Sequence, residues 1–134
     1  TEINLYAQSL LSLTHKKVLI RSINYLDIQE VDISICRRNY GTVAQIIVNE
    51  YHLDITIHLK DKTSYQIESQ SWNNFIKMVD MLKCHHVIVI DRLDVYENYF
   101  KDGKKYIEEL DKIFDMLADQ YHLSHYRAGN RRFL

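Results

Sequence analysis

The sequence predicts a small α+β domain built on an antiparallel β-meander. None of the 134 residues is proline and only three are glycine, where average composition would give about six or seven prolines and about nine glycines. Because these two residues mark most turns, we expect short turns between regular elements. The spacing of hydrophobic residues also changes along the chain between a helical period and a period of two, which indicates helices and strands in one domain.

The N-terminal segment is expected to be helical. Residues 3–14 place apolar side chains at helical spacing, and two lysines follow where they would favour the C-terminal end of a helix. Residues 18–25 fit a continued helix through Leu19 and Ile23, and alternate positions of the same segment fit a strand. Of these two alternatives we expect the helix.

The middle of the chain is expected to form the meander. Residues 31–36 alternate between apolar and polar, and residues 37–41 then predict a hairpin turn, because the glycine at its end accepts a positive φ. Residues 43–48 are expected to form the second strand. The clean alternation over residues 51–59 predicts a strand with one buried and one wet face, and residues 64–67 return as a further strand.

A middle helix is expected after the meander. Ser69 or Ser71 is a suitable N-cap, and residues 72–82 carry an apolar stripe at helical spacing. Residues 87–90 are apolar on both faces, which predicts an interior strand.

A long C-terminal helix is expected to complete the domain. It would begin at Asp102 or Gly103, after an irregular acidic stretch at residues 91–102. The predicted domain therefore covers residues 1–121. It has four to five strands flanked by an N-terminal, a middle and a long C-terminal helix, and residues 122–134 form a basic, aromatic tail.

Composition restricts the classes of function. The hydrophobic share of 46% is typical of a folded protein, and the formal net charge of −1 means that any basic surface must be local. Two cysteines do not make a disulfide scaffold, so we expect a reduced, cytosolic setting. No apolar run approaches the roughly 20 residues that a membrane helix needs, so we expect no membrane partner.

The tail and the predicted hairpin tip are candidate partner-binding surfaces. Both combine arginine with aromatic residues, and the tail lacks acids from Gln120 onward. Arginine forks pair with carboxylate or phosphate and aromatic rings stack, which suits an acidic protein surface and also nucleic acid. A solvated turn and a frayed terminus are the alternatives. The candidates are Arg127, Arg131, Arg132, Tyr126 and Phe133 in the tail and Arg37, Arg38 and Tyr40 at the tip.

A third candidate surface lies in the acidic stretch at residues 91–102. Tyr96, Tyr99 and Phe100 cluster there, and exposed aromatic rings in an acidic loop would suit a protein partner. The alternative is that the loop folds back and buries the rings.

The sequence also contains candidate metal ligands. Cys84, His85 and His86, with His122 and His125, contain ligand types for zinc, but their spacing lacks a C-x-x-C pair. The alternative is a buried thiol at the end of a helix, followed by histidines that favour its dipole.

Two further arrangements could carry catalysis. Asp91 and Asp94, with Glu97, could bind Mg²⁺, whereas Asp91 could instead cap the following turn. Cys36 precedes two arginines that could lower its pKa and make it a nucleophile.

We therefore expect a small non-enzymatic, cytosolic binding or regulatory protein without a cofactor, acting through a protein partner and with a homodimer as one plausible state. Scarce proline and alanine beside abundant Ile, Tyr, Asn and Lys indicate an AT-rich genome, which favours an inhibitor or immunity protein of a phage or mobile element. The alternative is a nucleic-acid-binding regulator that uses the arginines of the tip and tail. A second alternative is a metal-dependent hydrolase that uses Asp91, Asp94 and histidines.

Overall fold

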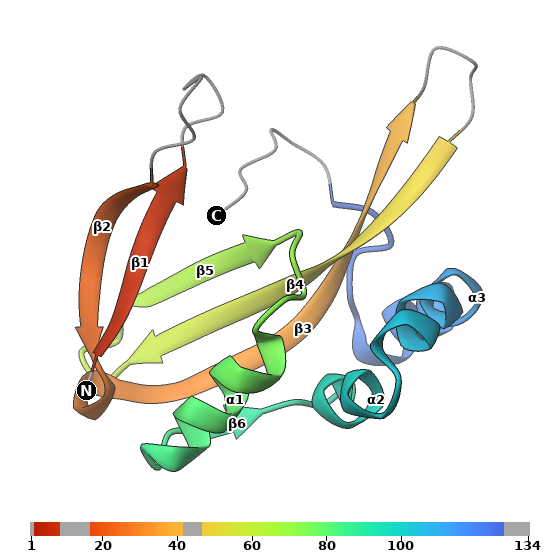
Figure 1. Cartoon of the computed structure of the whole chain (residues 1–134). Helices are drawn as coiled ribbons and strands as arrows, with labels where there is room; N and C mark the ends of the chain where they lie inside the picture. The colour runs from red at the N-terminus through yellow and green to blue at the C-terminus, as the bar shows by residue number, and fades with distance from the viewer. Residues whose placement is uncertain (1, 9–16, 42–46, 128–134) are drawn as a thin grey trace.

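The computed structural model describes residues 2–8, 17–41 and 47–127, and it confirms an α+β fold. The strands are β1 (Glu2–Gln8), β2 (Lys17–Asn24), β3 (Ile28–Gly41), β4 (Ile47–Leu59), β5 (Ser64–Ser69) and β6 (Ile88–Ile90). The helices are η1, a 3-10 turn (Tyr25–Asp27), α1 (Phe75–Cys84), α2 (Val95–Lys101) and α3 (Gly103–Tyr121). A four-stranded sheet has the order β5-β4-β3-β6, and β1 and β2 form a separate hairpin beside it (Figure 1).

The long antiparallel pair β3–β4 has one apolar and one polar face. Its register places Ile35 opposite Leu53 and Cys36 opposite His52, and successive side chains point to opposite faces of a sheet. The strand predicted at residues 51–59 is therefore confirmed, and β5 extends the same two faces, with Ile67 opposite Ile55.

The helices cover the apolar face and complete the core (Figure 1). Their buried residues recur every three or four positions, which gives each helix one apolar stripe. These residues are Phe75, Val79 and Leu82 in α1 and Tyr106, Leu110, Phe114 and Ala118 in α3. The predicted middle and C-terminal helices are confirmed. In the part of the chain that the structure describes, no helix combines the length and apolar character needed to cross a membrane.

The predicted N-terminal helix is wrong. Residues 2–8 and 17–24 are strands that pair antiparallel, with Ile3 opposite Ile23. The segments are short enough to fit both the helical period and the period of two. They form strands because they pair with each other and because Ile23 is buried against the core. Residues 9–14 of the predicted helix lie outside the described residues.

The predicted turn at residues 37–41 is also wrong. β3 continues through Gly41, which lies opposite Ile47 in β4. The two arginines remain in the strand because acidic side chains neighbour them in the fold, and Arg38 lies directly opposite Glu50. Most of the strand predicted at residues 43–48 falls outside the described residues, and its last two residues begin β4.

Three smaller predictions need correction. β6 lies at the edge of the sheet, parallel to β3, and its Ile88 is 61% exposed. The stretch expected to be irregular contains α2. The N-cap of α1 is Asn74, with φ of 65°, whereas Ser71 accepts a hydrogen bond from the Asn73 amide in the preceding turn (3.2 Å).

The start of α3 is confirmed and is packed tightly. The carboxylate of Asp102 accepts a hydrogen bond from the Lys105 amide (3.1 Å), as an N-cap should. The next residue, Gly103, lies against the ring of Tyr99. A Cβ atom at Gly103 would lie 2.6 Å from Tyr99 Cε2.

We predict that Gly103→Ala destabilises the protein by about 1–3 kcal/mol, because the ring of Tyr99 must move and that cost exceeds the better helix propensity of alanine. Urea unfolding measures the change. The control is Lys104→Ala at the next, exposed position, which should stay within about 0.5 kcal/mol of wild type. A more stable Gly103→Ala variant would contradict this account.

Candidate functional site

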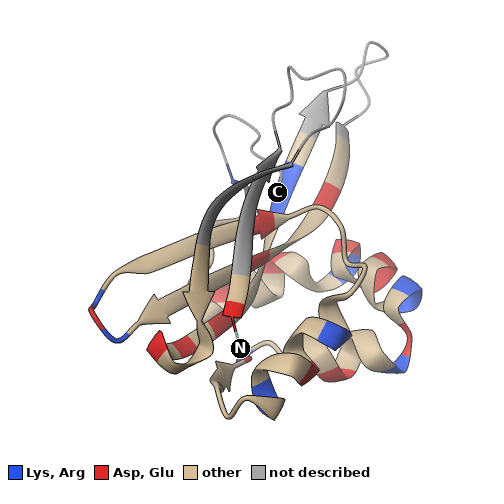
Figure 2. Ribbon diagram, turned by 60° about the vertical axis from the view of Figure 1, so that its left-hand side comes forward, with Lys and Arg blue, Asp and Glu red and all other residues tan. Residues whose placement is uncertain are grey.

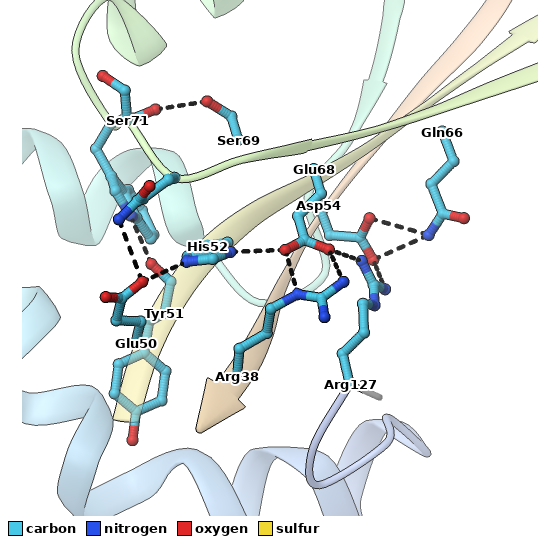
Figure 3. Close-up of polar contacts among 12 residues, drawn as sticks. Arg38, Glu50, Tyr51, His52, Asp54, Gln66, Glu68, Ser69, Ser71 and Arg127 are labelled. Atoms are coloured by element: carbon cyan, nitrogen blue, oxygen red, sulfur yellow. Dashed lines mark hydrogen bonds and ion pairs between the residues drawn. The ribbon is translucent and has the colours of Figure 1, made fainter. Parts of the chain in front are cut away.

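A buried ionic cluster lies on the polar face of the sheet, centred on Glu68 of β5 (Figure 3). Arg38 of β3 contacts both carboxylate oxygens, Nε to Oε2 at 2.6 Å and Nη2 to Oε1 at 2.9 Å. The side chains of both residues are only 9% exposed. This bidentate geometry is among the strongest that charged side chains form.

His52 of β4 extends the cluster to a second carboxylate (Figure 3). Its Nδ1 lies 2.6 Å from Glu68 Oε2 and its Nε2 lies 3.0 Å from Glu50 Oε2. The residue is 0% exposed. Both ring nitrogens are therefore engaged inside the fold.

Arg127 brings the C-terminal segment into the same cluster. Its Nη2 lies 2.5 Å from Asp54 Oδ2 and its Nη1 lies 3.2 Å from Glu68 Oε1. Its backbone amide also donates to the carbonyl oxygen of Arg37 at 2.8 Å. The ionic cluster thus joins three strands to the segment that follows α3, and it consists of Arg38, Glu50, His52, Asp54, Glu68 and Arg127.

These contacts change the protonation of Glu68. Burial by itself raises the pKa of this carboxyl, but hydrogen bonds from Arg38, His52 and Arg127 outweigh burial and lower the pKa to about 2. Glu68 is therefore ionised at neutral pH and holds the neighbouring cations in place.

Arg37 points to the opposite face of β3 and is 3% exposed. Its Nη2 contacts Asp115 of α3 at 2.6 Å, and its Nε donates to the carbonyl oxygen of His125 at 2.9 Å. The guanidinium also lies over the rings of Phe114 (4.8 Å) and Tyr126 (4.0 Å). Such a desolvated cation between two rings anchors the C-terminal segment to the sheet.

The structure pairs three of the five proposed partner-binding arginines with acidic side chains of the same chain. Arg37, Arg38 and Arg127 lie close together, yet each is paired with a carboxylate of this chain. The backbone of Tyr40 lies in β3. Arg131, Arg132 and Phe133 fall outside the described residues.

Cys36 does not have the properties of a nucleophile. Burial raises the pKa of its thiol to about 12; Glu68 and Asp54 add to this effect, and Arg127 and Arg38 oppose it. A neutral, buried thiol is unreactive. The expected low pKa of this thiol is wrong, because burial outweighs the lowering effect of Arg127 and Arg38.

The candidate zinc ligands do not come together in the described residues. His85 stacks on Tyr25, with ring centroids 4.0 Å apart, and Cys84 is exposed. His125 instead lies between Asp115 (2.9 Å) and Asp119 (2.7 Å).

Two other groups in the described part of the chain have potential ligand atoms within 4.8 Å of one another. Cys36, His52 and Glu68 form one of them, inside the ionic cluster. Glu30, Asp32 and His58 form the other, where His58 already contacts Asp32 at 2.9 Å.

Asp91 has a structural role at the start of α2. Its carboxylate accepts hydrogen bonds from the amides of Val95 (2.9 Å) and Tyr96 (2.8 Å). This confirms the interpretation of Asp91 as a cap. Asp94 is the N-cap residue of the same helix, with φ of 53°.

The predicted aromatic surface divides into a packed and an exposed part. Tyr99 is half-buried and stacks on Trp72, with ring centroids 5.1 Å apart. Tyr96 stacks on Phe100 (6.0 Å) and donates its hydroxyl to Asp80 of α1 (2.7 Å). Phe100 is 67% exposed.

These rings adjoin an open groove of about 850 Å³ between α1 and α2. We call this surface the aromatic groove. Its floor and walls include Trp72, Ile76, Asp80 and Tyr99, and Tyr96 and Phe100 lie beside it through the contact with Asp80.

Comparison of the chain with protein-family models, curated proteins and solved structures found no match.

We predict that Glu68→Gln destabilises the fold by about 3–5 kcal/mol, because it removes the carboxylate whose two oxygens both contact buried Arg38. Urea unfolding at pH 7 measures the loss. The matched control is Glu109→Gln on α3, whose carboxylate is 50% exposed and pairs only loosely with Lys105 (3.9 Å), so that its change should stay below about 0.5 kcal/mol. Equal losses in the two variants would argue against a central role for Glu68.

We also predict an acid-dependent loss of stability from Glu68. Its folded-state pKa of about 2 lies below its ordinary value of 4.5. The stabilisation is therefore complete above pH 4.5 and is lost as the pH falls toward 2, with a total of about 3 kcal/mol. Urea unfolding from pH 6 to pH 2 should show a steeper decline for wild type than for Glu68→Gln. Parallel declines would contradict the assignment.

Proposed function

We propose that the protein is a non-enzymatic binding protein and that its partner is a protein that docks in the aromatic groove. The observation that carries this proposal is the exposed ring of Phe100, which stacks on half-buried Tyr96 beside a groove lined by Trp72 and Tyr99. Aromatic residues of this kind are enriched among the residues that dominate the energy of protein interfaces.

The charges favour a protein over a nucleic acid. Nucleic-acid binding needs cations that are available to phosphates, whereas Arg37, Arg38 and Arg127 are paired with carboxylates of the same chain. Basic and acidic residues are interspersed over the helices (Figure 2). Mixed charge around an apolar centre is typical of protein interfaces.

The contacts of the candidate catalytic residues support a binding role over a catalytic one. The Cys36 thiol is neutral, both nitrogens of His52 contact carboxylates, and Asp91 caps a helix. Both cysteines are free thiols, which supports a cytosolic setting. With the composition of an AT-rich genome, these features support an inhibitor or immunity protein of a phage or mobile element.

The groove also indicates what the partner must offer. Its apolar walls, Trp72, Ile76 and Tyr99, suit an aliphatic or aromatic anchor, and Asp80 provides an acceptor at the side. We therefore propose a partner segment with an exposed apolar anchor next to a hydrogen-bond donor or a basic residue.

A photo-crosslinking phenylalanine analogue at position 100 tests the proposal in cells of the source organism. We expect a crosslinked partner from position 100, whose ring stacks on Tyr96 beside the groove, and none from position 116, which is also exposed and apolar but lies on α3. With the purified partner, Phe100→Ala should weaken binding by about 30-fold or more, and Met116→Ala should change it less than about threefold.

Two results would overturn this proposal. Self-association of the purified protein that Phe100→Ala abolishes in analytical ultracentrifugation would identify the occupant as a second copy of the chain. Tight, salt-dependent binding of labelled DNA or RNA that survives Phe100→Ala would favour the nucleic-acid alternative.

A further inference from the structure

A second cavity, of about 390 Å³, lies between α1 and the apolar face of the sheet. Its walls include Leu53, Ile55 and Ile57 of β4 and Phe75, Met78 and Leu82 of α1. Trp72 and Tyr99, the stacked rings of the aromatic groove, are not among its described lining residues.

The size of this cavity is characteristic of a ligand site. Protein interiors pack like organic crystals and contain few voids larger than a water molecule. An apolar cavity of about 150 Å³ stays dry and already binds benzene, and sites for small molecules span about 300–1,000 Å³. Much of the wall is rigidly placed, since Leu53, Ile57 and Phe75 are each at most 3% exposed.

The apolar lining of the cavity runs along β4, and several polar lining residues lie near one end of that run. Leu53, Ile55 and Ile57 follow one another along the same face of β4, which spans about 13 Å. Ser69 lies opposite Leu53 at one end, and Val31 lies opposite Ile57 at the other. Four polar lining residues, Ser69, Ser71, Asn73 and Asn74, belong to the end of β5 and the loop before α1.

The polar end favours an anion. Lys77, in the first turn of α1, carries the one charge among the described residues that line the cavity. Asn74 does not cap α1 with its side chain, and the amides of Ile76 and Lys77 donate to no residue that the structure describes. The N-terminal end of a helix also carries a partial positive charge.

We propose that this cavity binds a medium-chain alkyl carboxylate, with the alkyl chain along β4 and the carboxylate beside Lys77. The apolar walls hold the chain, and Lys77 with the start of α1 selects the negative head group. This inference concerns a different ligand from the proposed protein partner. The cavity and the aromatic groove share lining residues at the start of α1, among them Phe75 and Lys77, whereas the wall formed by Leu53, Ile55 and Ile57 lines the cavity and not the groove.

Isothermal titration calorimetry of the purified protein with dodecanoate, below its critical micelle concentration, tests the proposal. We expect one site per chain, and about fivefold weaker binding of dodecanoate to Lys77→Gln. The matched control is Lys83→Gln, because Lys83 is also on α1 but its ammonium lies over the ring of Tyr96. This variant should bind dodecanoate with the affinity of wild type. Dodecanol should bind more weakly than dodecanoate and should be unaffected by Lys77→Gln.

Filling the cavity provides the second test. Ile55→Phe places extra atoms in the cavity and should lower dodecanoate affinity at least tenfold, with an unchanged or higher melting temperature. If Ile55→Phe does not fold, Ile67→Phe provides the same test at a partly buried lining position on β5. The proposed site would be wrong if dodecanoate did not bind to wild type. It would also be wrong if dodecanoate bound with undiminished affinity to a folded variant in which phenylalanine fills the cavity. Equal binding of dodecanol and dodecanoate would overturn the choice of an anion.

Discussion

The antiparallel pairing of β3 with β4 places the apolar core residues and the ionic cluster on opposite faces of the sheet. Its register places Ile33 and Ile35 with Ile55 and Leu53 on one side, where the helices complete the core. The same register places Cys36 beside His52 on the other side. A shift of one residue would move every side chain to the wrong face, so the core and the ionic cluster depend on the same hydrogen-bonded ladder.

The ionic cluster explains why a sheet can contain arginines that are almost fully buried. Removing a charge from water is unfavourable unless hydrogen bonds and opposite charges replace the solvent. Glu68 provides both for Arg38, and Arg127 adds a cation from the far end of the chain. On the opposite face, Asp115 and two aromatic rings replace the solvent around the Arg37 guanidinium. The C-terminal segment up to Arg127 is therefore part of the fold.

Helix α1 contributes to both proposed binding surfaces. Phe75 lines the cavity on the sheet side and also the aromatic groove, and Lys77 lies at the boundary between them. The helix is held to the core by Val79 and Leu82, which are at most 2% exposed. Both surfaces thus rest on one short helix that is anchored along a single apolar stripe.

The sequence by itself determined the elements that have one clear hydrophobic period: the strand over residues 51–59, the middle helix and the long C-terminal helix. It could not assign residues 2–8 and 17–24, because short apolar segments fit both periods and strand pairing is a long-range interaction. It identified the arginines and the aromatic residues but not their surroundings. Only the tertiary structure brought Glu68 to Arg38 and Arg127, which are 30 and 59 residues away. The acids on the polar faces of β4 and β5, Glu50, Asp54 and Glu68, were a local signal of that cluster. Their partners could not be assigned from the sequence, because charge pairing depends on distance in space.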